Sequence, residues 1–556
     1  MNVRDRIELA ERSSSSDAQR LIAIVAAVLR ELRPGDSRVP RLDDSLATDL
    51  GIDSLSRVEL IARIEAGFGV RLPERLAAAA GTPRDLLDAL AHAEAASGTT
   101  PLAAAPEVAP LVEVEGSPRR ARNLIDAFQW HLDTHPEREH VTIVEQDAVV
   151  ESFSYASLWT QARETAQGLA GAGIGPGDAV ALMLPTGGDF FRVFLATLMA
   201  GAIPVPLYPP LRWSQIAEHV RGRAAIMANS AAGLLVTVPE AMPVARLVRA
   251  EVPSLHAVTT VPRLRETRAP MASRAPARER DIAMLQYTSG STGDPKGVVL
   301  SHANLLANIR AMGVAARVRS TDRFVSWLPL YHDMGLIGAW LATMYHAVPL
   351  VIMPPTDFLG RPARWLWTIH RYHATISAGP NFAYEIAATK IVDDTDLQGL
   401  DLRTWRLAFN GAEPVRALTL RRFAERFAPY GFDARAMTPV YGLAEAGVGL
   451  AFPPLERGPW IDRIDARALS VDGRAVAAER TSEAVLEAVS CGAPLAGHEI
   501  RVVDGGGREL PQRQEGRVEF RGPSATSGYY RNPDASAKLF HDGWLDTGDI
   551  GYIAQG

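Results

Sequence analysis

A run of glycines and hydroxyl-bearing residues stands just ahead of a lysine near the middle of the chain. It comprises Thr288, Ser289, Gly290, Ser291, Thr292 and Gly293, and Lys296 follows three positions after the last glycine. Glycines let a backbone turn its N–H groups toward an anion, hydroxyls add donors, and the ammonium adds a compact charge. The run therefore predicts a loop that holds nucleotide phosphates. It is not a Walker A loop, because Lys296 lies between Pro295 and Gly297.

The choice of lysine at this place is informative because lysine is rare in the chain. Lys296, Lys390 and Lys538 are the only lysines among 58 basic residues, so the other 55 are arginines. A compact ammonium approaches phosphate where a planar guanidinium does not fit. We therefore interpret Lys296 as a catalytic residue rather than as part of a solvated turn, which is the alternative.

Three later stretches have side chains suited to the rest of a nucleotide. The turn 410–414 follows an apolar run and suits contact with a purine edge; in the segment 439–446, Tyr441 can stack on adenine and Glu445 can hold Mg²⁺. Asp549 offers a carboxylate to both ribose hydroxyls. Each stretch alone is compatible with an ordinary turn. The presence of all three after the phosphate loop, in this order in one chain, favours a single nucleotide site. The candidate nucleotide-binding residues in them are Asn410, Gly411, Ala412, Glu413, Pro414, Tyr441, Gly442, Leu443, Ala444 and Asp549.

A separate candidate site is Ser54, which stands just ahead of an amphipathic segment in an acidic neighbourhood. Serine is a preferred helix cap, so a purely structural role is one reading. The acidic residues nearby favour docking to a basic partner, which is the second reading; they are Asp43, Asp44, Asp49, Asp53, Glu59 and Glu65.

Hydrophobic periodicity predicts elements that position these residues. In the large region we expect strands at 141–144, 179–184, 203–207 and 282–285, helices at 155–172 and 190–200, and a helix capped by Ser301. Strands that alternate with helices predict α/β architecture with parallel sheets covered on both faces. Strands at 499–503 and 517–520 around Asp504–Gly507 predict a small β subdomain.

The chain divides into three compositional segments. Residues 1–94 have helical periodicity at 21–32 and 55–68, and a third helix is expected at 83–91, which predicts a small helical bundle. Residues 95–119 are rich in Ala, Pro, Gly, Ser and Thr and predict a flexible linker. Residues 120–556 form the large domain.

Bulk composition excludes several classes of protein. A length of 556 residues indicates more than one domain, and a net charge of −6 argues against a nucleic-acid partner. One cysteine, Cys491, excludes an internal disulfide framework. The polar N-terminus does not resemble a signal peptide, and no apolar run is long enough for a membrane span. We expect a cytoplasmic protein.

The segment Leu50–Leu55, with the sequence LGIDSL, resembles the attachment motif of acyl carrier proteins, and residues 1–94 agree with that family in length. The resemblance implies that Ser54 carries a 4′-phosphopantetheine arm whose thiol holds an acyl group. It also implies modification by a phosphopantetheinyl transferase. We expect the bundle of residues 1–94 to be of the four-helix type found in carrier domains.

From about residue 120 onward, the four nucleotide stretches resemble the adenylate-forming superfamily. The resemblance implies that ATP and a carboxylate form an acyl-adenylate and pyrophosphate, after which a thiol displaces AMP. Lys296 and Mg²⁺ would stabilise the charge on the phosphates. Thr288 and Glu445 are the candidate metal ligands.

Three segments resemble the fatty acyl-AMP ligase branch most, namely 326–338, 376–384 and 392–402. The resemblance places catalytic His332 where nucleotide and acyl pockets meet; a structural histidine is the alternative. In that branch the insertion at 392–402 is associated with poor use of CoA and transfer to an acyl carrier protein. We expect a fatty acid substrate, loaded on the chain's own carrier domain or a downstream one, for a polyketide, peptide or lipid assembly line.

The chain departs from the superfamily pattern at two places. Ala444 replaces a common threonine, as in the fatty acyl-AMP ligase branch. The superfamily continues past the ribose carboxylate into a smaller lid domain with a second lysine, whereas this sequence stops at Gly556. We therefore expect a chain truncated before the lid, with reduced activity.

Three other functions stay open at this point. One is an amino-acid adenylation domain, in which Asp333 would bind the substrate ammonium. Another is an acyl-CoA ligase. The third, from a different class, is a carrier and nucleotide-binding module without chemistry.

Overall fold

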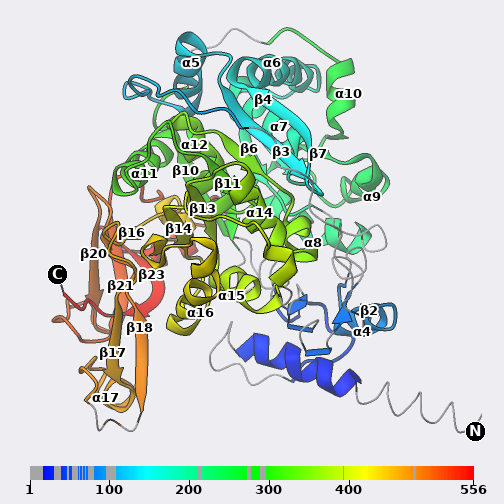
Figure 1. The fold of residues 1–556 in the computed structure, drawn as a ribbon. Coiled ribbons are helices and arrows are strands. Elements are labelled where there is room, and N and C mark those ends of the chain that lie inside the picture. The colour runs from blue at the N-terminus through cyan, green and yellow to red at the C-terminus, as the bar shows by residue number, and fades with distance from the viewer. Residues whose placement is uncertain are drawn as a thin grey trace, which may run out of the picture.

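The structure of the chain is a computed structural model, and Figure 1 shows its course from the blue N-terminal region to the red C-terminal strands. The structure describes residues 17–30, 39–46, 49–52, 60–61, 63–64, 67–68, 70–72, 80–95, 108–209, 216–271, 277–288, 296–391, 394–479, 482 and 484–555.

The described residues of the N-terminal region form an apolar core of their own, and about half of these residues are helical. Residues 17–30 are helical, α4 (Pro83–Leu90) begins at a capping box on Thr82, and β1 (Val70–Arg71) pairs with β2 (Glu94–Ala95). The helix predicted at 83–91 is confirmed, and the described residues of the two other predicted helices are helical. The domain boundary and the linker stay predictions; Val114 in the second half of that linker donates to Ser320 Oγ at 2.8 Å.

The large region is built on two sheets whose strands are mainly parallel. The larger has the strand order β15-β14-β13-β11-β12-β3-β4, in which only the edge strand β4 is antiparallel. The smaller, β6-β5-β7-β8, is parallel throughout. Their strands are β3 (Glu139–Glu145), β4 (Ala148–Ser154), β5 (Ala179–Met183), β6 (Ile203–Pro206), β7 (Ala232–Thr237), β8 (Ala257–Thr259), β11 (Phe324–Ser326), β12 (Leu350–Ile352), β13 (Ile376–Gly379), β14 (Leu407–Asn410) and β15 (Met437–Pro439).

Helices surround these sheets, as the strand–helix alternation predicts. The helix predicted at 155–172 is α6, and the one predicted at 190–200 is α7, so both are confirmed. The helices of the large region are α5 (Leu124–Thr134), α6 (Tyr155–Gly171), α7 (Gly188–Ala200), α8 (Ile216–Asn229), α9 (Met242–Val248), α10 (Val261–Glu266), α11 (His302–Ala315), α12 (Ala342–Tyr345), α13 (Pro355–Gly360), α14 (Ala363–Arg371), α15 (Asn381–Lys390), α16 (Ala417–Phe427), α17 (Ala466–Asp472) and α18 (Pro533–Leu539).

The last hundred residues form the predicted β subdomain. In Figure 1 the orange and red strands β20 (Glu499–Val503), β21 (Gly516–Arg521) and β23 (Trp544–Gly551) gather at one side of the green core. With β22 (Phe540–His541) they make a four-stranded antiparallel sheet. Short antiparallel pairs join β16 (Ala451–Phe452) to β19 (Ala493–Pro494), and β17 (Ile461–Asp465) to β18 (Val485–Val489).

Short helical turns complete the large region, and they include a π-helix beside the candidate site. The π-helix is η2 (Met334–Leu341), and the 3₁₀ turns are η1 (Pro239–Ala241), η3 (Asp394–Leu397), η4 (Ala428–Tyr430), η5 (Ala434–Ala436) and η6 (Ala444–Ala446).

Candidate functional site

The predicted phosphate loop connects two antiparallel strands. β9 (Ile282–Thr288) ends at Thr288, and β10 (Lys296–Ser301) begins at Lys296 directly across the ladder from it. The strand at 282–285 and the cap at Ser301 are confirmed, whereas β10 was not predicted. The loop residues Ser289, Gly290, Ser291, Thr292 and Gly293 lie outside the described residues. The hairpin thus fixes both ends of the loop and brings Thr288 beside Lys296.

Tyr529 joins Lys296 to Glu445, a contact that the sequence did not reveal. The Lys296 ammonium lies 5.5 Å from the centroid of the Tyr529 ring. The Tyr529 hydroxyl donates a 2.7 Å hydrogen bond to Glu445 Oε1, and burial is the main cause that raises the pKa of Tyr529 above its usual value. The pair Gly528-Tyr529 follows no recognisable motif, so the sequence offered no signal for this contact beyond an aromatic residue after a glycine.

Backbone pairing holds this tyrosine against the lysine strand. Val299 donates to the Gly528 carbonyl at 3.0 Å, and Tyr530 donates to the Gly297 carbonyl at 2.7 Å. Gly297 is required here, because a Cβ at this position would lie 2.7 Å from the Tyr287 ring. The lysine and the candidate metal ligand are therefore fixed relative to each other by a third segment of the chain.

The turn 410–414 starts where β14 ends at the carboxyl edge of the larger sheet. Asn410 is fully buried, yet its amide nitrogen and oxygen have no hydrogen-bond partner among the described residues. Ala412 has a positive φ of 68°, a conformation that costs energy for a residue other than glycine. A buried, unpaired amide beside a strained turn is typical of a ligand-binding site. Pro414 completes the turn.

Glu413 of this turn has a structural contact. One of its carboxylate oxygens accepts a 2.5 Å hydrogen bond from the backbone N–H of Phe382, in the first turn of α15. A carboxylate there satisfies a free helix donor and interacts favourably with the helix dipole. Its predicted part in nucleotide binding stays a prediction.

Tyr441 and Asp549 meet directly. The Tyr441 hydroxyl donates a 2.6 Å hydrogen bond to Asp549 Oδ2. Burial and the Asp549 carboxylate raise the pKa of Tyr441. Gly442 follows without a side chain because a Cβ would lie 1.7 Å from the Val448 carbonyl oxygen. The predicted adenine-stacking and ribose-binding residues therefore form one unit.

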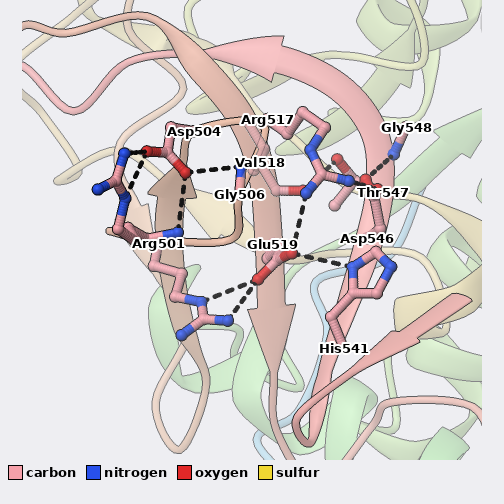
Figure 2. A network of polar contacts seen from close by, with 11 residues as sticks. Arg501, Asp504, Gly506, Arg517, Val518, Glu519, His541, Asp546, Thr547 and Gly548 are labelled. Atoms are coloured by element: carbon pink, nitrogen blue, oxygen red, sulfur yellow. Dashed lines mark hydrogen bonds and ion pairs between the residues drawn. The ribbon is translucent and has the colours of Figure 1, made fainter. Parts of the chain in front are cut away.

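A buried ion-pair network fixes the strand that carries Asp549. Figure 2 shows Glu519 on β21 between Arg501 and His541, and Arg517 reaching Asp546. Glu519 is fully buried and accepts two hydrogen bonds from Arg501, at 2.9 and 2.7 Å. His541 Nδ1 lies 3.1 Å from its other oxygen. A buried carboxylate needs such partners, since burying an unpaired charge is costly.

The same network reaches the residues of β23 just before Asp549. Arg517 donates to Asp546 Oδ2 at 2.9 Å, and Thr547 Oγ1 donates to the Val518 carbonyl at 2.9 Å. The Asp549 backbone N–H in turn donates to Thr547 Oγ1 at 3.1 Å. The position of the Asp549 carboxylate thus depends on side chains of β21.

His332 stands at the entry to the π-helix η2. Its Nδ1 lies 2.7 Å from Asp333 Oδ1, which also accepts the Met334 N–H at 2.7 Å. Gly335 is required, because a Cβ there would lie 2.2 Å from the Pro329 carbonyl oxygen. π-helical turns occur frequently at functional sites. Asp333 therefore orients His332 and caps the N-terminal end of η2.

One cavity of about 260 Å³ brings several of these residues together. His332, Ala412 and Tyr441 line one part of it, along with Asp333, Gly411, Gly442 and Leu443. The rest of the lining is largely apolar and includes Met312, Phe324, Met334, Val348, Ile376 and Phe409. Lys296, Glu445, Asn410 and Asp549 lie outside this lining. Such a cavity suits a ligand with a polar head and an apolar chain.

The donors present fit a magnesium ion held jointly with a nucleotide. Among the described residues, no group of three or more His, Cys, Asp or Glu side chains is arranged to hold a metal. Mg²⁺ usually binds through one or two carboxylates together with substrate phosphates. Glu445, held by Tyr529 near Lys296, is suited to that arrangement.

The predicted attachment residue Ser54 lies outside the described residues, but its motif borders the N-terminal core. Leu50 and Ile52 are buried in that core. Of the acidic residues around it, Asp43 is paired with Arg84 at 2.5 Å. This ion pair holds the pKa of Asp43 below its usual range, chiefly through the hydrogen bond from Arg84.

Two family models match the chain. The model of AMP-binding enzymes matches residues 128–530, and that of the phosphopantetheine attachment site matches residues 19–90. The chain belongs to the AMP-binding enzymes. No helix in the described ranges is long and apolar enough to cross a bilayer.

Individual relatives narrow the assignment. The chain is 37% identical to a putative acyl-CoA synthetase of Caulobacter vibrioides over 73% of this chain and 71% of the relative. It is 33% identical to the long-chain-fatty-acid–AMP ligase FadD26 of Mycobacterium bovis over 78% of this chain and 77% of the relative. A solved structure from a study of fatty acyl-adenylate ligases of E. coli and L. pneumophila superposes with a TM-score of 0.74, at 33% identity and 78% coverage of both chains.

Within the AMP-binding enzymes the chain belongs to the fatty acyl-AMP ligase family, and it carries a phosphopantetheine attachment domain. The sequence-based assignment of fold and family is therefore confirmed. Its cofactors are ATP, Mg²⁺ and 4′-phosphopantetheine.

Proposed function

We propose that this chain activates a fatty acid with ATP and passes the acyl group to the phosphopantetheine thiol of an acyl carrier domain. A carboxylate oxygen attacks the α-phosphorus of ATP, and the bond to pyrophosphate breaks. The thiol then attacks the acyl carbon, AMP leaves, and the thiol proton is released. The observation that carries the proposal is the single cavity lined by His332, Ala412 and Tyr441 at one part and by apolar side chains elsewhere.

Each candidate residue has a role in this proposal. Lys296 and the loop that begins at Thr288 bind the phosphates and stabilise the negative charge that develops on them. Tyr441 stacks on adenine while its hydroxyl orients Asp549 toward the ribose. Glu445, with Thr288, holds Mg²⁺, which supplies charge neutralisation between the phosphates.

His332 and the turn 410–414 act at the junction of the two substrates. His332 lines the cavity beside Ala412 and is held by Asp333, so its ring is positioned at the carboxylate end of the acyl chain. The buried Asn410 amide and the Gly411 and Ala412 backbone serve the purine edge, which supplies the amide with the partners it otherwise lacks.

The surroundings of Asp333 argue against an amino-acid substrate. Its Oδ1 is shared by His332 Nδ1 and the Met334 N–H, both at 2.7 Å. A substrate ammonium would have to compete with these two partners. The largely apolar lining farther along the cavity favours an aliphatic chain instead.

Two features favour a carrier thiol over CoA as acceptor. The first is the phosphopantetheine attachment match at residues 19–90 of the same chain. The second is the segment resembling the family insertion, whose described part packs on α14: the Asp396 carbonyl accepts from Trp367 Nε1 at 2.8 Å, and Leu397 is buried. Ser54 then carries the arm, and the chain serves as the loading portion of a polyketide, peptide or lipid assembly line.

The deciding experiment is mass spectrometry on the chain after treatment with a phosphopantetheinyl transferase and CoA. The chain, freed of excess CoA, is incubated with ATP, Mg²⁺ and a panel of fatty acids, with and without fresh CoA. We expect acyl-AMP, and an acyl group on the arm at Ser54; the Ser54→Ala variant forms acyl-AMP but carries no acyl group.

The other outcomes separate the alternatives. Accumulation of acyl-CoA would replace the proposal with an acyl-CoA ligase, and adenylates of amino acids alone would replace it with an amino-acid adenylation domain. Nucleotide binding without any adenylate would leave a binding module.

A further inference from the structure

A second, larger cavity of about 670 Å³ lies against the far end of the acyl cavity. The two cavities share three lining residues, Gly313, Val318 and His346. Gly313 belongs to α11, and His346 follows directly after α12. The shared residues are distinct from the cavity residues of the nucleotide motifs, so the second cavity adjoins the part of the acyl cavity where a long chain would end.

Of the three residues that line both cavities, His346 has the largest side chain, so its imidazole forms the partition between them. It packs on Gly313 so closely that a Cβ at that position would lie 2.1 Å from His346 Nε2. Glycine inside a helix is destabilising relative to alanine. Glycine is nevertheless required at position 313, because a larger residue would collide with the His346 ring.

Only a weak polar contact holds the partition. His346 Nε2 lies 3.3 Å from the Ile309 carbonyl oxygen, which is at the long end for a hydrogen bond. Burial lowers the pKa of His346, so the ring is neutral and Nε2–H is the donor. A neutral ring with one long hydrogen bond can turn aside for an acyl chain at little cost.

The charged side chains that line the second cavity are mainly basic. Its basic residues are Arg119, Arg310, Arg317 and Arg319, and its lining includes one carboxylate, Glu113. The guanidinium of Arg310 is fixed, since its Nε donates to the Tyr345 hydroxyl at 2.9 Å and its Nη2 to the Ala121 carbonyl at 2.8 Å. Arg119, Arg317 and Arg319 are exposed at the cavity rim.

Few acceptor groups of the protein would compete with a ligand for the guanidinium groups at the cavity rim. Arg317 has a loose contact with Glu456 at 3.8 Å, and both side chains are exposed. No hydrogen bond or ion pair of the Arg119 and Arg319 guanidinium groups is found within the described ranges. Guanidinium groups bind carboxylates in paired hydrogen bonds, whereas an aliphatic chain end gains nothing from them.

We propose that the second cavity binds an anionic group at the far end of the substrate, so that the enzyme takes long-chain acids bearing a second, terminal carboxylate. The proposal rests on the proposed function, since it concerns the chain whose other end is adenylated. The arginine-lined cavity opens on the surface. An acid that enters there places its reacting carboxylate at the nucleotide end of the acyl cavity. Its second carboxylate then remains among the arginines of the second cavity.

The test compares monocarboxylic and α,ω-dicarboxylic acids of equal length in the pyrophosphate-release assay, from short to long chains. The readout is the ratio of kcat/KM for the dicarboxylic acid to kcat/KM for the monocarboxylic acid, which is internal to each preparation. For short chains we expect a ratio below one. Once the chain is long enough to pass His346, we expect the ratio to rise to about ten or more, the gain from one charged pair.

Variants distinguish this subsite from a general effect of surface charge. In the double variant Arg119→Gln, Arg319→Gln, the ratio for long acids should fall toward one, whereas Arg120→Gln, an exposed neighbour outside the lining, should leave it unchanged. The His346→Ala variant should shift the rise to shorter chains.

A ratio near or below one at every length, with monocarboxylic acids activated, would overturn the subsite and leave the proposed function standing. Loss of carrier loading in the arginine variant without any change in the ratio would also overturn it, since the arginines would then bind the carrier domain. Failure to activate any acid of either series would instead count against the proposed function.

Discussion

The Tyr441 hydroxyl donates a 2.6 Å hydrogen bond to the Asp549 carboxylate, although the two residues are 108 positions apart in the sequence. The bond occupies Oδ2 and leaves the other carboxylate oxygen for a ligand. An aromatic ring and a carboxylate fixed together in this way can bind the base and the sugar of one nucleoside. Each side chain limits the freedom of the other before the ligand arrives, which favours binding.

This pairing predicts a coupled effect on nucleotide affinity. Tyr441→Phe keeps the ring but frees Asp549, and we expect AMP to bind about three- to tenfold more weakly, the value of one modest hydrogen bond. Asp549→Asn should weaken binding further. In the double variant the tyrosine change should add little, because its partner is already altered. Isothermal titration calorimetry measures the three affinities.

The control for this cycle is Tyr552→Phe, which removes a hydroxyl that is 3.0 Å from Asp462. It should bind AMP like the unmodified chain. Fully additive effects of Tyr441→Phe and Asp549→Asn would contradict the coupling.

Replacing the loop lysine tests the need for a compact charge. Lys296→Arg conserves the charge, yet we expect kcat for adenylate formation to fall about 100-fold, because the guanidinium does not fit the phosphate position. Lys538→Arg, an exposed lysine on α18, is the matched control and should change kcat less than about twofold. An active Lys296→Arg enzyme would show that charge alone suffices.

Tyr529→Phe tests the contact between the lysine and the candidate metal ligand. The variant keeps the ring beside Lys296 but removes the hydrogen bond to Glu445. We expect the Mg²⁺ concentration for half-maximal rate to rise about tenfold, since outer hydrogen bonds of this kind tune metal affinity by 10–100-fold. The measurement is pyrophosphate release against Mg²⁺ concentration.

A lower melting temperature with an unchanged Mg²⁺ dependence would mean that Tyr529 is only structural. Tyr530→Phe, at the neighbouring position, is the control. It should leave the Mg²⁺ dependence as it is.

Buried histidines predict that the large domain loses stability in acid. Burial lowers the pKa of His140 from 6.5 to about 3 and is the main cause that lowers the pKa of His131 to about 2. His140 Nε2 also accepts the Trp340 indole N–H at 3.0 Å, which requires the unprotonated ring. Below about pH 6.5 these histidines are therefore protonated in the unfolded chain but not in the folded chain, so the free energy of unfolding decreases as the pH falls.

Each such histidine costs about 1.4 kcal/mol of unfolding free energy per pH unit as the pH falls below 6.5. His140→Gln should reduce the slope of stability against pH by about that amount, between about pH 6 and pH 4. Urea unfolding at several pH values measures it. An unchanged slope in His140→Gln would contradict the prediction.

Local patterns in the sequence determined much of this protein. Short apolar runs predicted β3, β5 and β6, because strands of a sheet covered on both faces are buried along their whole length. Longer segments with apolar residues at helical spacing predicted α6 and α7. The Gly/Ser/Thr run, the rare Lys296 and the LGIDSL motif indicated nucleotide and carrier chemistry, because backbone freedom and charge are local properties of a residue.

Only the tertiary structure decided which distant segments meet. The Tyr529 bridge from Lys296 to Glu445 and the Tyr441–Asp549 bond each depend on chain segments far apart in sequence. The neighbouring basic cavity likewise depends on α11, α12 and the segment near Arg119. Periodicity predicts which face of an element is buried but not which element packs against it. The packing partner depends on how well whole surfaces fit together.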